Sequence, residues 1–266
     1  MKSTVVAVAL KSLLLFTAIA NAEEIVTLSA RDGTTQSFLL ASPERGTPEA
    51  AVILFPGGVG AIRLRTEGGV IRLAEGNFVV RSRQMFVDRG IATAVVDAPS
   101  DQSRGMDDSF RLGEQHATDI TRISATLKSR FPGVAVFLVG TSRGTISAAA
   151  VASAFGDGGA GIVLSSTLLV GSRRGPGLSK FDYSRIKAPV LLVHHAEDGC
   201  NVTPYHNARS LADKLRYPLI TVNGGNPPTS EPCEAQSAHG YLGKEMETVD
   251  AIVKWMLKKP YPANIE

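Results

Sequence analysis

The chain has 266 residues, of which 44% are hydrophobic and 20% are charged, and this length suits one α/β domain with a single core. Its 28 Lys and Arg residues nearly balance its 25 Asp and Glu residues, and no long basic run offers a phosphate-binding stripe. We therefore expect no nucleic-acid partner.

The first segment, residues 1–22, combines the basic residues Lys2 and Lys11 with the apolar run SLLLFTAIA and ends in ANA. This arrangement predicts a secretory signal peptide that is cleaved after Ala22. A transmembrane anchor is the alternative, but the apolar run is shorter than a bilayer span requires. We expect a protein exported to the periplasm or secreted, with no stable membrane anchor and a single domain at 23–266. The removed segment holds two lysines and no acid, which lowers the net charge from +3 to +1.

Short β-branched and apolar runs follow the signal segment. EIVTLSA (24–30) and TQSFLLAS (35–42) predict an opening hairpin. Further strands are predicted at 50–55, 91–98, 134–140, 160–166, 188–195 and 218–222. Near-continuous apolar strands of this length are typical of a parallel sheet that is covered on both faces.

Segments with helical spacing of apolar residues separate the later strands. They are marked by Ile120, Ile123 and Leu127, by Leu211 and Leu215, and by Val249, Ile252, Val253 and Met256. A hairpin followed by repeated strand and helix units predicts an α/β fold, with a doubly wound, mostly parallel sheet of about eight strands.

The strand at 134–140 runs into Gly140-Thr141-Ser142-Arg143-Gly144, which matches the pattern G-x-S-x-G. Alone this pattern is weak evidence, because glycine is frequent in the chain. Here a predicted strand precedes it and the alanine-rich segment TISAAAVASAF, predicted as a helix, follows it. In this context the sequence resembles the α/β-hydrolase superfamily over residues 24–258. The resemblance implies that Ser142 is a nucleophile on a sharp turn, followed along the chain by an acid and a histidine.

The acid and the histidine have candidates in the expected order. The strand at 188–195 leads into AEDGC, which places Asp198 where the superfamily's acid usually lies. Glu197 is the rival acid, and a solvated turn is the alternative role of Asp198. His239, in the loop after the last strand, completes the order serine, aspartate, histidine. The remaining histidines are expected in structural or helical positions: His116, His194, His195 and His206.

These residue types must meet for a chemical reason. A serine hydroxyl becomes a good nucleophile when an imidazole accepts its proton, and a carboxylate fixes the tautomer of that imidazole. The oxyanion that forms needs N–H donors, and the backbone of Arg143 supplies one by its position. We expect Gly58, in the loop FPGGVG, to supply the second. Many relatives have His-Gly at this point where this chain has Pro56 before Gly57, and a plain glycine turn is the alternative.

The chain has two cysteines, Cys200 and Cys233, and pairing is the default in an oxidising compartment. A disulfide between them would tie the loop of Asp198 to the loop of His239. Two buried free thiols are the alternative.

The segment at 167–187 is too short for the large cap that many relatives insert there, so we expect a minimal cap and a water-soluble ester substrate. Arginines cluster between 61 and 83, and Arg81 and Arg83 are candidates for binding an anionic substrate. A solvated basic face is the alternative.

The sequence therefore predicts an exported serine hydrolase that cleaves carboxylic esters through an acyl-enzyme. A peptidase or amidase on the same fold, or a catalytically silent binding protein, remains open. We expect no metal and no cofactor: GDGGAG (156–161) resembles a dinucleotide-binding motif but precedes a strand, where a loop is the simpler interpretation. The oligomeric state stays open.

Overall fold

A computed structural model of the chain describes residues 23–266, so the predicted signal peptide lies outside the described residues. Within this part, no helix is long and apolar enough to cross a membrane.

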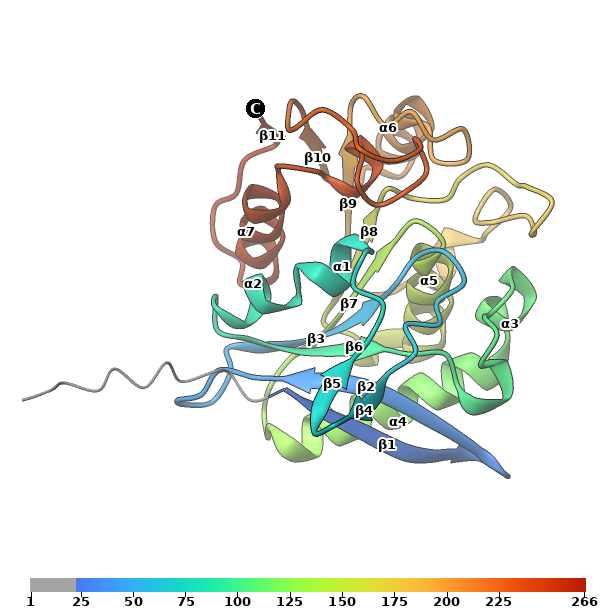
Figure 1. The fold of residues 1–266 in the computed structure, drawn as a ribbon. Coiled ribbons are helices and arrows are strands. Elements are labelled where there is room, and N and C mark those ends of the chain that lie inside the picture. Colours follow the sequence, from blue (N-terminus) through green and yellow to red (C-terminus); the bar gives the residue numbers. More distant parts are fainter. Residues whose placement is uncertain (1–22) are drawn as a thin grey trace, which may run out of the picture.

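The core of the fold is a sheet of nine strands in the order β1-β2-β6-β3-β7-β8-β9-β10-β11 (Figure 1). The strands are β1 (Glu24–Arg31), β2 (Thr34–Ala41), β3 (Ala50–Phe55), β6 (Ile91–Val96), β7 (Val136–Thr141), β8 (Gly161–Ser165), β9 (Val190–His195), β10 (Leu219–Val222) and β11 (Asn264–Ile265). The β1–β2 hairpin and the β2–β6 pair are antiparallel, and all other neighbours in this sheet are parallel. The predicted hairpin and mostly parallel sheet are confirmed.

Apolar strands form the centre of this sheet because both of its faces are covered. Every residue of β3, β6, β7 and β9 is buried. The helices are α1 (Phe78–Arg81), α2 (Arg83–Val87), α3 (Asp108–Leu112), α4 (Glu114–Arg130), α5 (Gly144–Phe155), α6 (Tyr205–Leu215) and α7 (Glu245–Met256).

The two helical layers bury opposite sides of the same strands. Ile120 of α4 and Ile146 of α5 share a hydrophobic cluster with Ile53 of β3. Phe86 of α2 and Ile252 of α7 share the other cluster with the neighbouring β3 residues. Successive residues of a strand point to opposite faces, so one apolar strand serves both layers. Figure 1 shows α4 and α5 on one side of the sheet and α2 and α7 on the other.

Two elements differ from the sequence prediction. The connection from β3 to α1 contains a second, two-stranded sheet made of β4 (Arg65–Glu67) and β5 (Val70–Arg72). Gly68 and Gly69, both at positive φ, form its two-residue turn, a combination that favours a hairpin. The ninth strand of the main sheet, β11, follows the last helix. It has only two residues, which is too short for a hydrophobic pattern in the sequence to reveal it.

Candidate active site

Ser142 stands on the sharp turn between β7 and α5, with a φ of 53°. A positive φ strains a residue that carries a side chain, and such strain is a feature of nucleophile elbows. The turn can be this tight because a glycine follows it: a Cβ on Gly144 would lie 2.0 Å from the carbonyl oxygen of Phe55. The Ser142 amide donates to the Ser165 carbonyl at 3.0 Å, which fixes the turn against β8.

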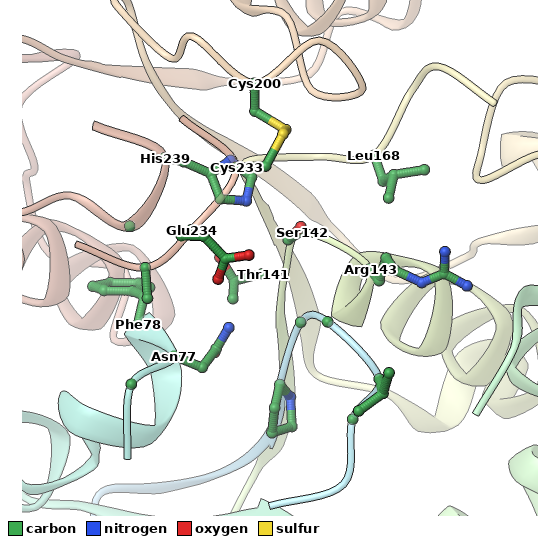
Figure 2. A pocket seen from close by; sticks show the side chains of 18 of the residues that line it. Asn77, Phe78, Thr141, Ser142, Arg143, Leu168, Cys200, Cys233, Glu234 and His239 are labelled. Atoms are coloured by element: carbon green, nitrogen blue, oxygen red, sulfur yellow. A yellow bond between two sulfur atoms is a disulfide. The ribbon is translucent and has the colours of Figure 1, made fainter. Parts of the chain in front are cut away.

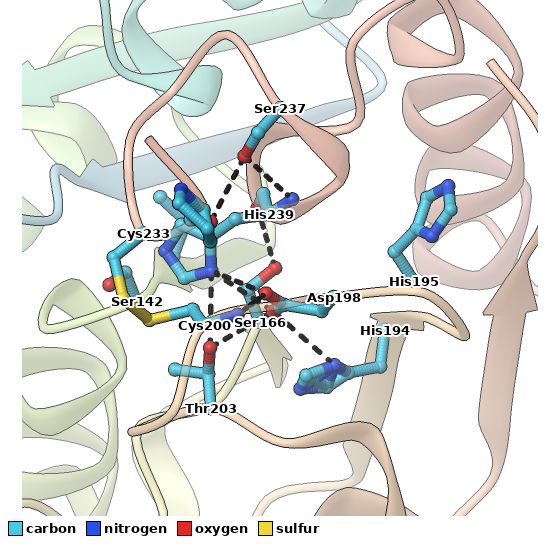
Figure 3. Close-up of polar contacts among 12 residues, drawn as sticks. Ser142, Ser166, His194, His195, Asp198, Cys200, Thr203, Cys233, Ser237 and His239 are labelled. Carbon is cyan, nitrogen blue, oxygen red and sulfur yellow. Dashed lines mark hydrogen bonds and ion pairs between the residues drawn. A yellow bond between two sulfur atoms is a disulfide. The ribbon is translucent and has the colours of Figure 1, made fainter. Parts of the chain in front are cut away.

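Asp198 and His239 are in direct contact. Asp198 lies in the turn after β9, and His239 lies in the short 3₁₀ turn η4 (Ala238–Gly240). The His239 Nδ1 atom is 3.0 Å from Oδ2 and 3.3 Å from Oδ1 of Asp198 (Figure 3). Both side chains are buried, so solvent does not compete strongly for this contact. A carboxylate at Nδ1 favours the tautomer that leaves Nε2 available to accept a proton.

Thr203 also holds this carboxylate, and sequence reasoning missed it. Its hydroxyl donates to Asp198 Oδ2 at 2.9 Å and lies 3.1 Å from His239 Nδ1. The Cys200 amide donates to Asp198 Oδ1 at 3.0 Å. Both donors come from the loop that carries the acid, so this loop itself orients the carboxylate toward His239 (Figure 3). No local pattern distinguishes Thr203 from any other threonine in a loop.

Ser166 and Tyr241, which the sequence did not point to, hold the backbone of His239. The Ser166 hydroxyl donates to the His239 carbonyl at 2.8 Å, and the Tyr241 hydroxyl donates to the Val193 carbonyl at 2.8 Å. The Ser166 amide donates to the Tyr241 hydroxyl at 3.0 Å. Tyr241 is fully buried, which raises its pKa above the usual value, so it stays a neutral donor. This network ties η4 to the ends of β8 and β9.

His194 and His195, at the end of β9, do not line the pocket. His194 is buried with its Nδ1 4.0 Å from Asp198 Oδ2, and burial lowers its pKa to about 4. The Nε2 atom of His195 pairs with the Gly224 carbonyl at 2.9 Å. His239 is the histidine that lines the pocket beside Ser142.

Ser142 and His239 open into a pocket of about 670 Å³. Figure 2 shows the two side chains at its centre, with Arg143 on one side and Glu234 on the other. This volume lies within the range of small-molecule sites. The connection between β8 and β9, where a cap would be inserted, contains one short 3₁₀ turn, Tyr183–Arg185. Among the described residues, therefore, no cap domain covers the pocket.

The loop after β3 forms one wall of this pocket. The Gly60 amide donates to the Gly57 carbonyl at 3.1 Å, which closes a tight turn with Gly58 at a φ of 58°. A Cβ on Gly57 would lie 3.0 Å from the Ser142 Cβ, so the turn approaches the serine closely. Within residues 23–266, the main-chain amides of Gly58 and Arg143 have no hydrogen-bond acceptor. Both are therefore available to a bound group.

Cys200 and Cys233 form a disulfide, as predicted, with Cα atoms 4.5 Å apart. Both cysteines line the pocket. The bond joins the loop of Asp198 to the long loop that precedes His239, so it constrains the two loops that carry the contacting pair.

Arg81 and Arg83 do not reach the pocket. Arg81 donates to Glu245 Oε1 at 2.9 Å and to the Gly240 carbonyl at 2.6 Å. Arg83 pairs with Glu23 at 2.6 Å and with Glu75 at 3.1 Å. The arginines that line the pocket are instead Arg143, Arg173 and Arg174.

The side chain of Arg143 is itself engaged. Its guanidinium forms a buried ion pair with Asp108 and donates to the Arg174 carbonyl at 3.4 Å. Among residues 23–266, no group of three or more His, Cys, Asp or Glu side chains is arranged to hold a metal ion.

No protein-family model matches the sequence, and no curated protein matches it significantly. Solved structures do match. The esterase Est1E from Butyrivibrio proteoclasticus is 15% identical, with a TM-score of 0.62 over 88% of this chain and 98% of that one. A cold-adapted esterase from an Arctic intertidal metagenomic library is 15% identical, with a TM-score of 0.56 over 89% and 93%. A dienelactone hydrolase from Anabaena variabilis is 14% identical, with a TM-score of 0.58 over 90% and 96%. The nine-stranded sheet and these matches together show that the chain has the α/β-hydrolase fold.

Proposed function

We propose that this protein is an exported serine hydrolase that cleaves carboxylic esters, with Ser142 as nucleophile, His239 as base and Asp198 as the acid that orients the base. The observation that carries the proposal is the 3.0 Å contact between His239 Nδ1 and Asp198 Oδ2, beside a serine at positive φ that lines the same pocket. A buried His–Asp pair next to a strained serine is the arrangement that acyl transfer requires.

The reaction proceeds in two halves. His239 Nε2 takes the proton of the Ser142 hydroxyl as the serine oxygen attacks the ester carbonyl, and the resulting oxyanion is stabilised by the amides of Arg143 and the Gly57–Gly60 turn. The tetrahedral intermediate expels the alcohol, which takes the proton from His239, and leaves an acyl-enzyme. In the second half, His239 takes a proton from a water molecule as that water attacks the acyl group. His239 then returns the proton to the Ser142 oxygen, and the acid product leaves.

The substrate class rests on the pocket and on the solved structures. A structure of Est1E is described with ferulic acid bound, and further matches are structures of one cold-adapted esterase. Among residues 23–266 no cap domain covers the pocket, which favours an ester that dissolves in water over an interfacial lipid. Pocket arginines also favour an acyl or alcohol group that carries a negative charge.

A peptidase is the second candidate. The chain matches part of a dipeptidyl peptidase 4 from Porphyromonas gingivalis, with a TM-score of 0.55 over 90% of this chain and 36% of that one. A matched pair of substrates with the same acyl group, one an ester and one an anilide, separates the two. The proposal requires turnover of the ester with no measurable cleavage of the anilide, because a peptidase would cleave both.

Export is supported by two features. The disulfide between Cys200 and Cys233 belongs to oxidising compartments, and residues 1–22 have the pattern of a signal peptide. Glu23, the first residue after the predicted cleavage point, pairs with Arg83. The mass of protein recovered from the periplasm or medium should correspond to a chain that begins at Glu23.

The experiment that tests the proposed chemistry is labelling with a fluorophosphonate, which reacts with activated serines. Wild type should be labelled on Ser142, and Ser142→Ala should not be labelled. Ser172→Ala is the matched control, because Ser172 lines the same pocket and its hydroxyl accepts from the Arg174 amide instead of contacting the His–Asp pair. A folded wild type that resists labelling would instead favour a silent binding protein.

A further inference from the structure

Arg111, at the end of α3, is a charged side chain that the proposed reaction does not use. Its exposure is 0%, and it is the largest of the fully buried side chains. Nη1 donates to the Ser147 hydroxyl at 2.8 Å, and Nη2 donates to the Gly58 carbonyl at 3.3 Å. The guanidinium therefore touches the same turn that forms the wall of the pocket beside Ser142.

The turn is shaped to admit this guanidinium. A Cβ on Gly60 would lie 2.4 Å from Arg111 Nη2, so only glycine leaves room for the charged group at that point. Gly60 also has a φ of 75°, which a side chain would make costly. The close approach of Arg111 to the turn thus depends on a glycine in the turn itself.

Stability alone is a poor reason to bury this charge. Within the described residues, the Nε atom of Arg111 has no hydrogen-bond partner. Burial lowers the pKa of Arg111 to about 9, and the nearby charge of Arg143 acts in the same direction while Asp108 opposes it. The side chain remains charged at neutral pH. Substituting a buried charged side chain that has incomplete partners by an apolar side chain of similar size often costs no stability.

The geometry of the turn shows what the charge can do. The Gly58 carbonyl points to Arg111, and in a trans peptide the N–H of the next residue points the opposite way. That N–H belongs to Val59, which lines the pocket with Gly58. The structure records no acceptor for the Val59 amide within residues 23–266.

We propose that Arg111 is a positioning residue for acyl transfer: its guanidinium fixes the Gly58–Val59 peptide plane and so presents the Val59 amide to the oxyanion. This inference rests on the proposed function, and it adds Val59 to Gly58 as a donor from the turn. A cation on the carbonyl also polarises the peptide and strengthens the N–H on its other side. The hydrogen bond from the Val59 amide strengthens as negative charge develops on the substrate oxygen. It therefore stabilises the transition state more than the bound substrate.

The test uses Arg111→Met, with Arg111→Lys as a second variant that keeps the charge but loses the planar fork. Arg89→Met is the matched control, because Arg89 pairs with Asp250 and does not line the pocket. Each variant is assayed with an aryl acetate and with the corresponding thionoacetate. Sulfur accepts hydrogen bonds more weakly than oxygen, so the ratio of the two rates reports the oxyanion donors.

For the aryl acetate, Arg111→Met should lower kcat by about 10- to 100-fold with little change in KM, less than the full loss of an oxyanion donor. The preference for the oxygen ester over the thionoester should fall by a similar factor. Arg111→Lys should show the same loss, and Arg89→Met should keep the wild-type ratio. Folded Arg111 variants with the wild-type ratio would overturn the proposal.

A second measurement does not depend on catalysis. In ¹⁵N-labelled protein, the amide resonance of Val59 should shift in Arg111→Met and in Arg111→Lys, and stay in place in Arg89→Met. An unmoved Val59 resonance would overturn the positioning role. If wild type neither hydrolyses esters nor accepts a fluorophosphonate, the proposed function fails, while the Val59 resonance still decides whether Arg111 fixes this peptide.

Discussion

The Nδ1 atom of His239 lies 3.0 Å from Oδ2 of Asp198, although 41 residues separate them in the chain. The same Oδ2 accepts the hydroxyl of Thr203 at 2.9 Å. Asp198 is therefore held by its own loop, and His239 is held by Asp198 and by the hydroxyl of Ser166 on its carbonyl. The contact engages Nδ1 of His239, and in the proposed reaction the other ring nitrogen, Nε2, takes the proton of Ser142.

Thr203→Val should lower kcat for an aryl acetate about 10-fold and leave KM nearly unchanged. The substitution keeps the shape of the side chain but removes the donor to Asp198 Oδ2, so the carboxylate orients His239 less well. Thr203→Ser restores the hydroxyl and should recover most of the activity. Equal activity in Thr203→Val and wild type would remove Thr203 from the site.

Loss of the disulfide should reduce both stability and activity. Cys200→Ser with Cys233→Ser opens a bridge that spans 33 residues, which the chain-entropy account values at about 4 kcal/mol. The loops of Asp198 and His239 then move independently, and kcat should fall by about 10- to 100-fold. Urea unfolding and initial rates measure the two effects. Native wild type that takes up two alkylating groups without reductant would contradict the bridge.

Acid should destabilise the fold through His116. Burial, then the nearby Arg111 and Arg31, lower its pKa to about 3 from the ordinary 6.5. Between these two pH values the unfolded chain binds a proton that the folded chain does not. The contribution of neutral His116 to the free energy of unfolding is therefore complete above pH 6.5 and decreases as the pH falls toward 3. The loss for this group is about 1.4 kcal/mol per pH unit at most.

The measurement is the free energy of unfolding in urea at pH 7 and pH 5. His116→Leu should show a smaller drop between the two values than wild type does. His206→Leu is the matched control, because His206 is exposed and should leave the drop unchanged. An identical pH dependence in wild type and His116→Leu would show that His116 protonates freely in the folded protein.

Arg173→Ala should lower kcat/KM for esters that carry a carboxylate several-fold and spare neutral esters of similar size. Arg173 is exposed at the pocket, so its charge attracts an anionic substrate from solvent. The effect should shrink as salt is added. Arg81→Ala is the comparison: it removes a donor to the Gly240 carbonyl next to His239, so it should affect both classes of ester alike. An equal loss of kcat/KM for carboxylate-bearing and neutral esters in Arg173→Ala would show that the charge of Arg173 does not select the substrate.

Much of the fold could be predicted because local patterns determine it. Runs such as AAVILF become β3, and each of its residues is buried as an apolar strand between two helical layers must be. The pair Gly68-Gly69 carried an equally local hairpin signal that the arginine-rich composition of the segment obscured.

The site is only partly visible in the sequence, because its supporting contacts are distant in the chain. The order of Asp198 and His239 along the chain could be read from the resemblance to a superfamily, and the structure places the two in contact. The interactions of Tyr241 with Val193 and of Arg111 with Gly58 join residues 48 and 53 positions apart. Arg81 donates to Glu245 and to the Gly240 carbonyl next to His239, so it supports the backbone beside the site, which its place in an arginine-rich segment did not indicate.

The central claim, ester hydrolysis through an acyl group on Ser142, is tested most directly by trapping the intermediate. Wild type mixed with an excess of an aryl acetate, quenched in acid within the first turnovers and digested, should yield an acetylated peptide that contains Ser142. His239→Ala and Ser142→Ala should yield none, and Ser172→Ala should match wild type. Retained ester hydrolysis by purified Ser142→Ala, or an acetyl group on another residue of the wild type, would contradict the account.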